Sequence, residues 1–80
     1  MIPPLNKFKR LDVREMIRNG IEPFPLIFER AEKLKPEEGL IVVAPFLPSP
    51  LIEKLGSEGF ASRLERGRGA DWLVYFWRED

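Results

Sequence analysis

The chain has 80 residues, of which 44% are hydrophobic and 32% charged, and its 13 basic and 13 acidic side chains leave no net charge. A chain of this length forms one small domain, residues 1–80 with a loose lead-in over residues 1–6. Its single core supplies only about 3–5 kcal/mol of net stability, so oligomerisation would help it. The sequence contains neither cysteine nor histidine, which excludes a disulfide, a thiol nucleophile, an imidazole base and an ordinary zinc site.

The charge balance and the apolar runs indicate the kind of partner. Equal numbers of acidic and basic side chains produce no field that attracts a polyanion, so no nucleic acid is expected. No apolar run reaches the roughly 20 residues that a membrane span needs, and residues 1–4 do not resemble a signal peptide. We therefore expect a cytoplasmic protein. The absence of glutamine and the many Arg, Glu and Pro residues are typical of a thermophile.

The first predicted elements are a strand and a helix. Residues 7–14 are predicted as a strand, because Lys9, Leu11 and Val13 alternate onto one face. A break at residues 19–20 follows, and then Pro23 suits the first position of a helix. The apolar residues of this helix recur at three- and four-residue spacing, which predicts an amphipathic helix: Phe24, Ile27, Phe28, Ala31 and Leu34.

The next pair of elements repeats this order. Residues 40–44 form a continuous apolar run rich in β-branched residues, which predicts a central strand. Ser49 and Pro50 then suit the N-cap and the first position of a second helix, with Leu51, Ile52 and Leu55 on its apolar side.

The last third of the chain predicts a hairpin. Residues 60–65 alternate as a half-buried edge strand, and residues 67–69 provide a turn with positive φ. The return strand, residues 72–77, is apolar on both faces. The predicted fold is α+β, a two-layer α/β sandwich of order β-α-β-α-β-β, in which right-handed crossovers place both helices on one face of a four-stranded mixed sheet.

This architecture leaves one apolar sheet face without helices. The alternation along the central strands places five side chains together on that face: Ile41, Val43, Leu73, Tyr75 and Trp77. A monomer seldom exposes so aromatic a patch, and burying it at roughly 25 cal/mol per Å² would stabilise a marginal domain. We expect these residues to form the interface of a homodimer, face to face, or to dock another protein.

Five segments carry a resemblance to a known superfamily. They are Leu11-Asp12-Val13-Arg14, Glu22-Pro23-Phe24-Pro25, Lys35-Pro36-Glu37-Glu38-Gly39, Pro48-Ser49-Pro50-Leu51 and the final strand that begins at Trp72. Their order and spacing resemble the TusA/SirA-like superfamily, and in particular its cysteine-free branch of domains without an established function. The resemblance implies the same two-layer order of strands and helices.

The resemblance also implies what this chain lacks. In the sulfur-carrying branch the first helix opens with Cys-Pro-x-Pro, whose thiolate carries a persulfide at the positive end of the helix. Glu22 stands at that position here, so sulfur relay is not available. The cysteine-free branch tends to have Asp and His before its Pro-x-Pro-Leu, where this chain has Ala44-Pro45-Phe46-Leu47. No metal, cofactor or catalytic residue is therefore expected.

The alternative function is a small-ligand-binding protein or catalyst that uses Glu22, Arg14 and Asp12, with Phe46 lining the ligand pocket or plugging the end of the sheet. For Glu22 we favour a helix-start carboxylate, and for Asp12 with Arg14 a structural ion pair. RNA binding is a weaker third hypothesis, suggested by a similar layout in the C-terminal domain of translation initiation factor three. The favoured hypothesis is a non-enzymatic interaction module.

Overall fold

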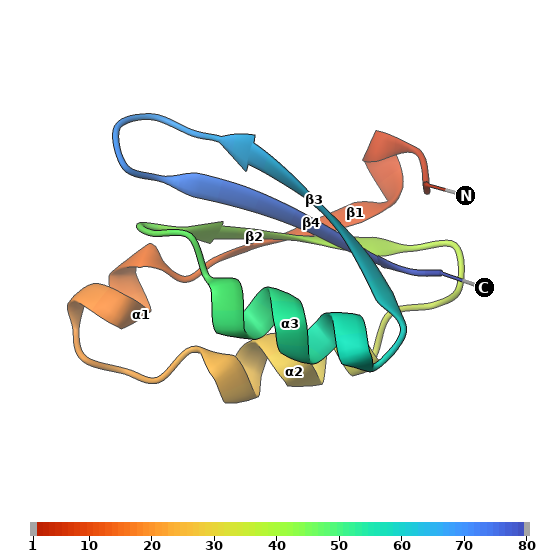
Figure 1. The fold of residues 1–80 in the computed structure, drawn as a ribbon, viewed down its shortest axis with the longest axis horizontal. Coiled ribbons are helices and arrows are strands. Elements are labelled where there is room, and N and C mark those ends of the chain that lie inside the picture. The colour runs from red at the N-terminus through yellow and green to blue at the C-terminus, as the bar shows by residue number, and fades with distance from the viewer. Residues whose placement is uncertain (1, 80) are drawn as a thin grey trace.

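The computed structural model describes residues 2–79, which form two layers, a four-stranded sheet and a layer of helices (Figure 1). The strands are β1 (Phe8–Asp12), β2 (Gly39–Ala44), β3 (Phe60–Arg66) and β4 (Trp72–Arg78), in the order β1-β2-β4-β3. β1 and β2 are parallel, whereas β4 is antiparallel to both β2 and β3. This mixed sheet confirms the predicted fold.

Two longer helices, α2 (Phe24–Glu32) and α3 (Ser49–Ser57), cover one face of the sheet (Figure 1). Their buried residues Ile27, Ala31, Leu51 and Leu55 belong to one cluster with inward side chains of the strands. The strand residues of that cluster are Leu11, Leu40, Val42, Ala44, Phe60, Val74 and Phe76. The core therefore lies between the sheet and these two helices.

The predicted helix starts need small corrections. Pro23 is the N-cap of α2 rather than its first residue, and Pro25 occupies the first turn instead. Ser49 is the first residue of α3, with Pro48 at the N-cap and no side-chain cap. Proline can precede or open a helix because its φ is already helical and its missing N–H is not needed there.

The first strand is shorter than predicted, because it ends before residues 13 and 14, where a short helix begins. β1 ends at Asp12, and α1 (Arg14–Arg18) follows directly. The Asp12 Oδ1 accepts a hydrogen bond from the Arg14 backbone N–H at 3.0 Å, a local turn that competes with the extended chain. Val13 stays 1% exposed at the N-cap of α1, so the apolar alternation that suggested a strand reflects burial at a helix start.

The segment before β1 lies on the other side of the sheet. It contains a single 3-10 turn, η1 (Leu5–Lys7), in a region that the sequence predicts only as a loose lead-in. Figure 1 shows η1 above the sheet, opposite α2 and α3. The chain therefore places a short segment of its own on the face that has no long helix.

Candidate functional site

The face of the sheet turned away from α2 and α3, here called the open face, consists of three rows of side chains across the strands. The strand pairing gives the rows Phe8–Gly39–Trp77–Ala61, Arg10–Ile41–Tyr75–Arg63 and Asp12–Val43–Leu73–Glu65. The central strands β2 and β4 contribute apolar and aromatic residues, apart from one glycine. The edge strands contribute charges in two of the three rows.

All five residues predicted as an interface lie on this open face, but the chain covers them more than expected. Val43 and Trp77 are only 2% and 6% exposed. Ile41, Leu73 and Tyr75 are half-buried. The open face is therefore a partly covered surface rather than a bare apolar one.

Aromatic rings and the N-terminal segment cover the first row. The Phe8 ring makes edge contacts with the rings of Tyr75 and Trp77, at centroid distances of 5.4 and 6.4 Å. It also lies over Gly39, its partner in the β1–β2 register. Trp77 donates its indole N–H to Glu79 Oε2 at 3.2 Å, which satisfies the polar atom of this buried ring.

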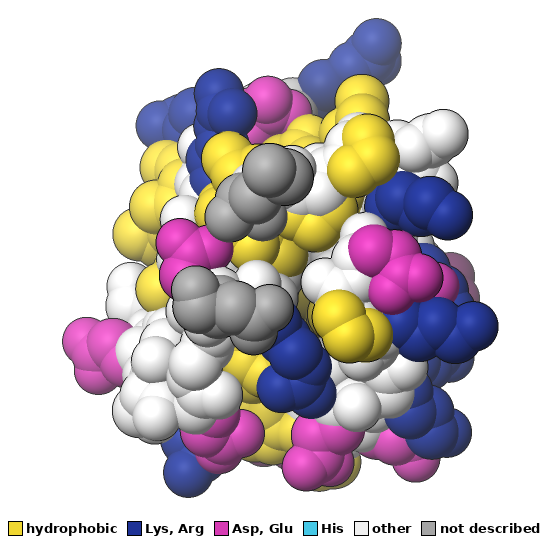
Figure 2. Space-filling model, turned by 90° about the vertical axis from the view of Figure 1, so that its right-hand side faces the viewer, with side chains coloured by type: hydrophobic (Ala, Val, Ile, Leu, Met, Phe, Trp, Pro, Cys, Tyr) yellow, Lys and Arg dark blue, Asp and Glu magenta, His cyan; other side chains and the backbone are white. Residues whose placement is uncertain are grey.

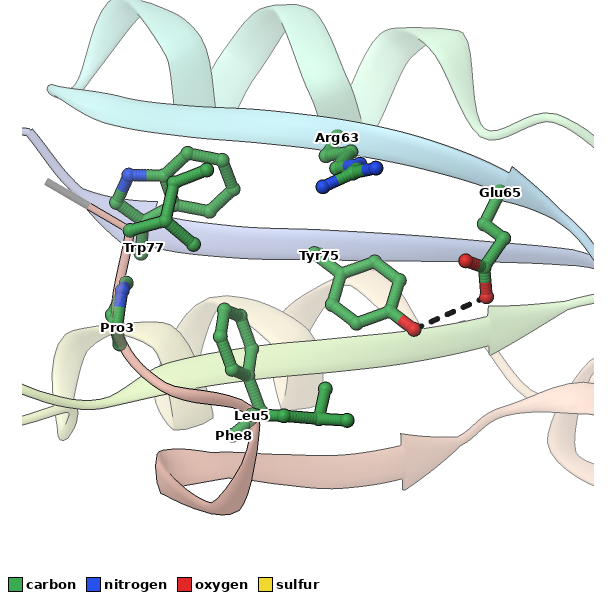
Figure 3. Close-up of a pocket in the computed structure, with 8 residues that line it drawn as sticks. Pro3, Leu5, Phe8, Arg63, Glu65, Tyr75 and Trp77 are labelled. Atoms are coloured by element: carbon green, nitrogen blue, oxygen red, sulfur yellow. Dashed lines mark hydrogen bonds between the residues drawn. The ribbon is translucent and has the colours of Figure 1, made fainter.

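A hollow of about 290 Å³ remains between these rings and the N-terminal segment, and we call it the aromatic-end hollow. Figure 3 shows the Glu65 side chain extending from β3 toward the Tyr75 hydroxyl, with Arg63 above Tyr75 and Leu5 beside Phe8. The Tyr75 hydroxyl donates to Glu65 Oε1 at 3.2 Å. Partial burial, together with this hydrogen bond, raises the pKa of the Tyr75 phenol above its ordinary value. The lining residues are Ile2, Pro3, Leu5, Phe8, Arg63, Glu65, Tyr75 and Trp77.

The N-terminal segment adds exposed apolar surface next to this hollow. Leu5 is 70% exposed and Ile2 is 52% exposed. Seen from the side of the molecule where the termini lie, hydrophobic side chains gather in the upper part of the surface, and charged side chains surround them (Figure 2). Apolar side chains displayed in this way are more typical of a contact surface than of an isolated monomer.

The opposite end of the open face is charged. A second hollow of about 240 Å³, the charged-end hollow, has Val43 and Leu73 among its apolar lining and arginines among its charged lining. Its lining residues are Arg10, Arg14, Val43, Gly67, Arg68, Asp71 and Leu73. The open face thus changes along the strands from aromatic to charged.

Arg14 is held in place by two carboxylates. Its Nε and Nη2 donate to Asp12 at 2.9 and 2.6 Å, and its Nη1 donates to Asp71 Oδ2 at 2.7 Å. The bidentate hydrogen bonds from Arg14 lower the pKa of Asp12 to about 2, and the two aspartates raise the pKa of Arg14 above its usual value. This geometry links β1, α1 and the β3–β4 hairpin, so Asp12 and Arg14 form a structural ion pair.

A family model described as "Uncharacterized conserved protein (DUF2249)" matches residues 10–78, which is most of the chain. The chain belongs to the DUF2249 family. No curated protein and no solved structure matches it. In this DUF2249 domain the N-terminal segment and Phe8, which cover the aromatic end of the open face, lie outside the matched range.

Of the other predicted site residues, Glu22 and Phe46 lie away from the open face. Glu22 and Phe46 share a separate hollow of about 360 Å³ at the start of α2, together with Ile17, Gly20, Ile21, Pro23 and Phe24. The Glu22 carboxylate lies 3.4 Å from the Phe24 backbone N–H, a long contact in keeping with a helix-start residue. Asp12 and Arg14 do not line this hollow; they line another with Glu15 and Arg18.

The sequence pattern alone did not indicate that the N-terminal segment and the edge charges belong to the candidate surface. Arg10, Arg63 and Glu65 could have been placed on it from the alternation of β1 and β3, because residues two apart share a face. The position of η1 has no such periodic signal. Within residues 2–79, no three acidic side chains gather as a metal site would require. None of the helices in this range has both the length and the hydrophobicity of a membrane span.

Proposed function

We propose that this DUF2249 domain is a non-catalytic interaction module and that the open face of its sheet is the surface through which it associates, with a second copy as the simplest partner. The observation that carries the proposal is the make-up of this face. Half-buried Ile41, Leu73 and Tyr75 form its centre, and opposite charges stand along both edges. A partly apolar centre with a polar rim is the usual anatomy of a protein–protein interface.

The chemistry available elsewhere supports a binding role. Cysteine and histidine are absent from the sequence, and the carboxylate whose pKa is lowered to about 2, that of Asp12, accepts hydrogen bonds from Arg14. Glu22, in the position of the sulfur-carrying cysteine of the TusA/SirA-like proteins that the sequence resembles, cannot hold a transferable sulfur. Ligand binding or catalysis at the start of α2 has less support, because Glu22 lies in one hollow while Asp12 and Arg14 line others.

The experiment is sedimentation velocity of the purified chain across the micromolar range, compared with two variants. Tyr75→Glu places a charge in the centre of the open face, whereas Leu64→Glu does so on the other side of the sheet, where Leu64 is already 44% exposed. We expect the wild type and Leu64→Glu to be dimers and Tyr75→Glu to be a folded monomer, with folding checked by urea unfolding. A wild type that is monomeric throughout, or a Tyr75→Glu variant that dimerises as the wild type does, would contradict the proposal.

A further inference from the structure

The two edges of the open face carry the same charges in the same order. On β1, Arg10 lies in the Tyr75 row and Asp12 in the Leu73 row. On β3, Arg63 lies in the Tyr75 row and Glu65 in the Leu73 row. Each edge therefore presents a positive charge in one row and a negative charge in the next.

This pattern selects between two ways of packing two copies face to face. A two-fold axis that runs along the strands places β1 of one copy over β3 of the other within the same row, so that Arg10 faces Arg63 and Asp12 faces Glu65. A two-fold axis that runs across the strands, between the two rows, places each strand over its own copy in the opposite direction. Arg10 then faces Asp12, and Arg63 faces Glu65, at both ends of the interface.

We propose that two DUF2249 chains pack by their open faces around a two-fold axis that runs across the strands between the Tyr75 and Leu73 rows, so that Arg63 pairs with Glu65 of the other copy on the β3 edge, and Arg10 lies opposite the Arg14-bound Asp12 on the β1 edge. This inference rests on the proposed function and adds the orientation of the partner. Oppositely charged side chains that face each other across an interface fix the relative position of the two copies. The axis along the strands would place like charges opposite each other, which disfavours that arrangement. Strands that run nearly antiparallel are compatible with face-to-face packing of twisted sheets.

The same axis places the N-terminal segment of each copy opposite the charged-end hollow of the other copy. The segment lies over the Phe8–Trp77 row, and the symmetry places it over the row beyond Leu73 in the second copy, where Gly67 and Asp71 border the charged-end hollow. Leu5, which is 70% exposed in the single chain, would then meet the apolar lining formed by Val43 and Leu73. One protruding segment thus fits over one hollow at each end of the dimer.

The test uses the β3 edge, because Asp12 on the β1 edge is already paired with Arg14. Arg63→Glu leaves two acidic residues on this edge, and Glu65→Arg leaves two basic ones. Either variant replaces two attractive pairs in the dimer by two repulsive ones. We expect each to raise the dimer dissociation constant by about tenfold or more at low salt.

Mixing the two variants in equal amounts provides the decisive readout. A heterodimer of the Arg63→Glu and Glu65→Arg chains has both pairs restored, so we expect it to form with a dissociation constant near that of the wild type, as measured by sedimentation or native mass spectrometry. Arg30→Glu and Glu53→Arg, on α2 and α3, are controls with the same net charges; each should dimerise like the wild type, and their mixture should show no preference for the heterodimer.

The outcomes separate this inference from the proposed function. If the wild type dimerises but Arg63→Glu and Glu65→Arg do so equally well, or if their mixture fails to form a heterodimer, the orientation is wrong while the open face can still be the interface. If the wild type is monomeric, the proposed function itself fails. Circular dichroism of each variant excludes loss of folding as the cause of weaker association.

Discussion

The two faces of the sheet are similar in hydrophobicity along the central strands, but they differ in how completely the rest of the chain packs over them. β4 alternates Val74 and Phe76 toward the helices with Leu73, Tyr75 and Trp77 on the open face, and both sets are apolar or aromatic. The helix side is closed by α2 and α3, so that Val74 and Phe76 are 0% exposed. Within residues 2–79, the open side has the N-terminal segment and long edge side chains above it. An apolar strand pattern therefore identifies two hydrophobic faces of the sheet. The packing of α2 and α3 on one of them decides which face becomes the core.

Neighbouring aromatic residues on β4 give the largest contrast. Phe76→Ala removes a fully buried ring and should lower the free energy of unfolding by about 3–5 kcal/mol, whereas Tyr75→Ala, on the half-buried side, should cost about 1 kcal/mol. Urea unfolding followed by circular dichroism measures both. If Phe76→Ala does not fold, Phe76→Leu against Tyr75→Leu gives the same ordering. Equal losses at the two positions would mean that the open face is as much a core as the other.

A pair of glycines tests how tightly the aromatic end of the open face is packed. A Cβ at Gly39 would come within 2.8 Å of Phe8 Cζ, so Gly39→Ala must displace the ring, at a cost of about 1–3 kcal/mol in the free energy of unfolding. A Cβ at Gly56, in α3, would meet nothing within 4 Å, and Gly56→Ala should stabilise by about 0.5–1 kcal/mol. Urea unfolding measures both changes. In a Phe8→Ala background the cost of Gly39→Ala should shrink; an unchanged cost would place the strain elsewhere.

The smallest effect concerns the charged end. The pKa of Asp12 is about 2 in the folded protein, below its ordinary value of 3.8, so the folded state binds fewer protons there than the unfolded state. The stabilisation from the Asp12–Arg14 ion pair is therefore present above about pH 4 and is lost as the pH falls toward 2. Because both side chains are more than a third exposed, Asp12→Asn should cost less than about 1 kcal/mol at neutral pH.

Unfolding by urea between pH 2 and 7 measures this effect. The wild type should lose stability more steeply than Asp12→Asn between pH 4 and 2, since the variant has no carboxylate to protonate. Parallel curves for the two proteins would show that the Asp12–Arg14 contact does not contribute to folding.

Much of the fold could be predicted from the chain because its signals are local. The 3.6-residue period of residues 24–34, the β-branched run at 40–44 and the glycines around residue 68 each act within a few neighbours. α1 could not be predicted this way, since its five residues carry little periodicity and its start depends on the Asp12 side chain bonding the Arg14 backbone. A strand and a short helix with a buried N-cap residue look alike over so short a stretch.

The candidate site could be predicted only in part. Alternation placed Ile41, Val43, Leu73, Tyr75 and Trp77 on one face, and the strand pairing confirms that they share it. The exposure of Tyr75 and Trp77 could not be inferred from the pattern, because it depends on Phe8 and the N-terminal segment, which come from a distant part of the chain. Similarly, Glu22 and Arg14 are eight residues apart but line different hollows, since α1 and the following turn separate them.

The sequence by itself therefore determined the α+β class, the order of the strands and of the two longer helices, the two apolar faces and the absence of thiol and imidazole chemistry, all of which follow from residue type and local period. Only the tertiary structure decided which apolar face became the core, which charges share a row across the sheet, and how Arg14 joins Asp12 to Asp71 on the hairpin. These features depend on the register of strands far apart in the chain, which is set by backbone hydrogen bonds and by the packing of two helices on one side, and no local pattern encodes that register.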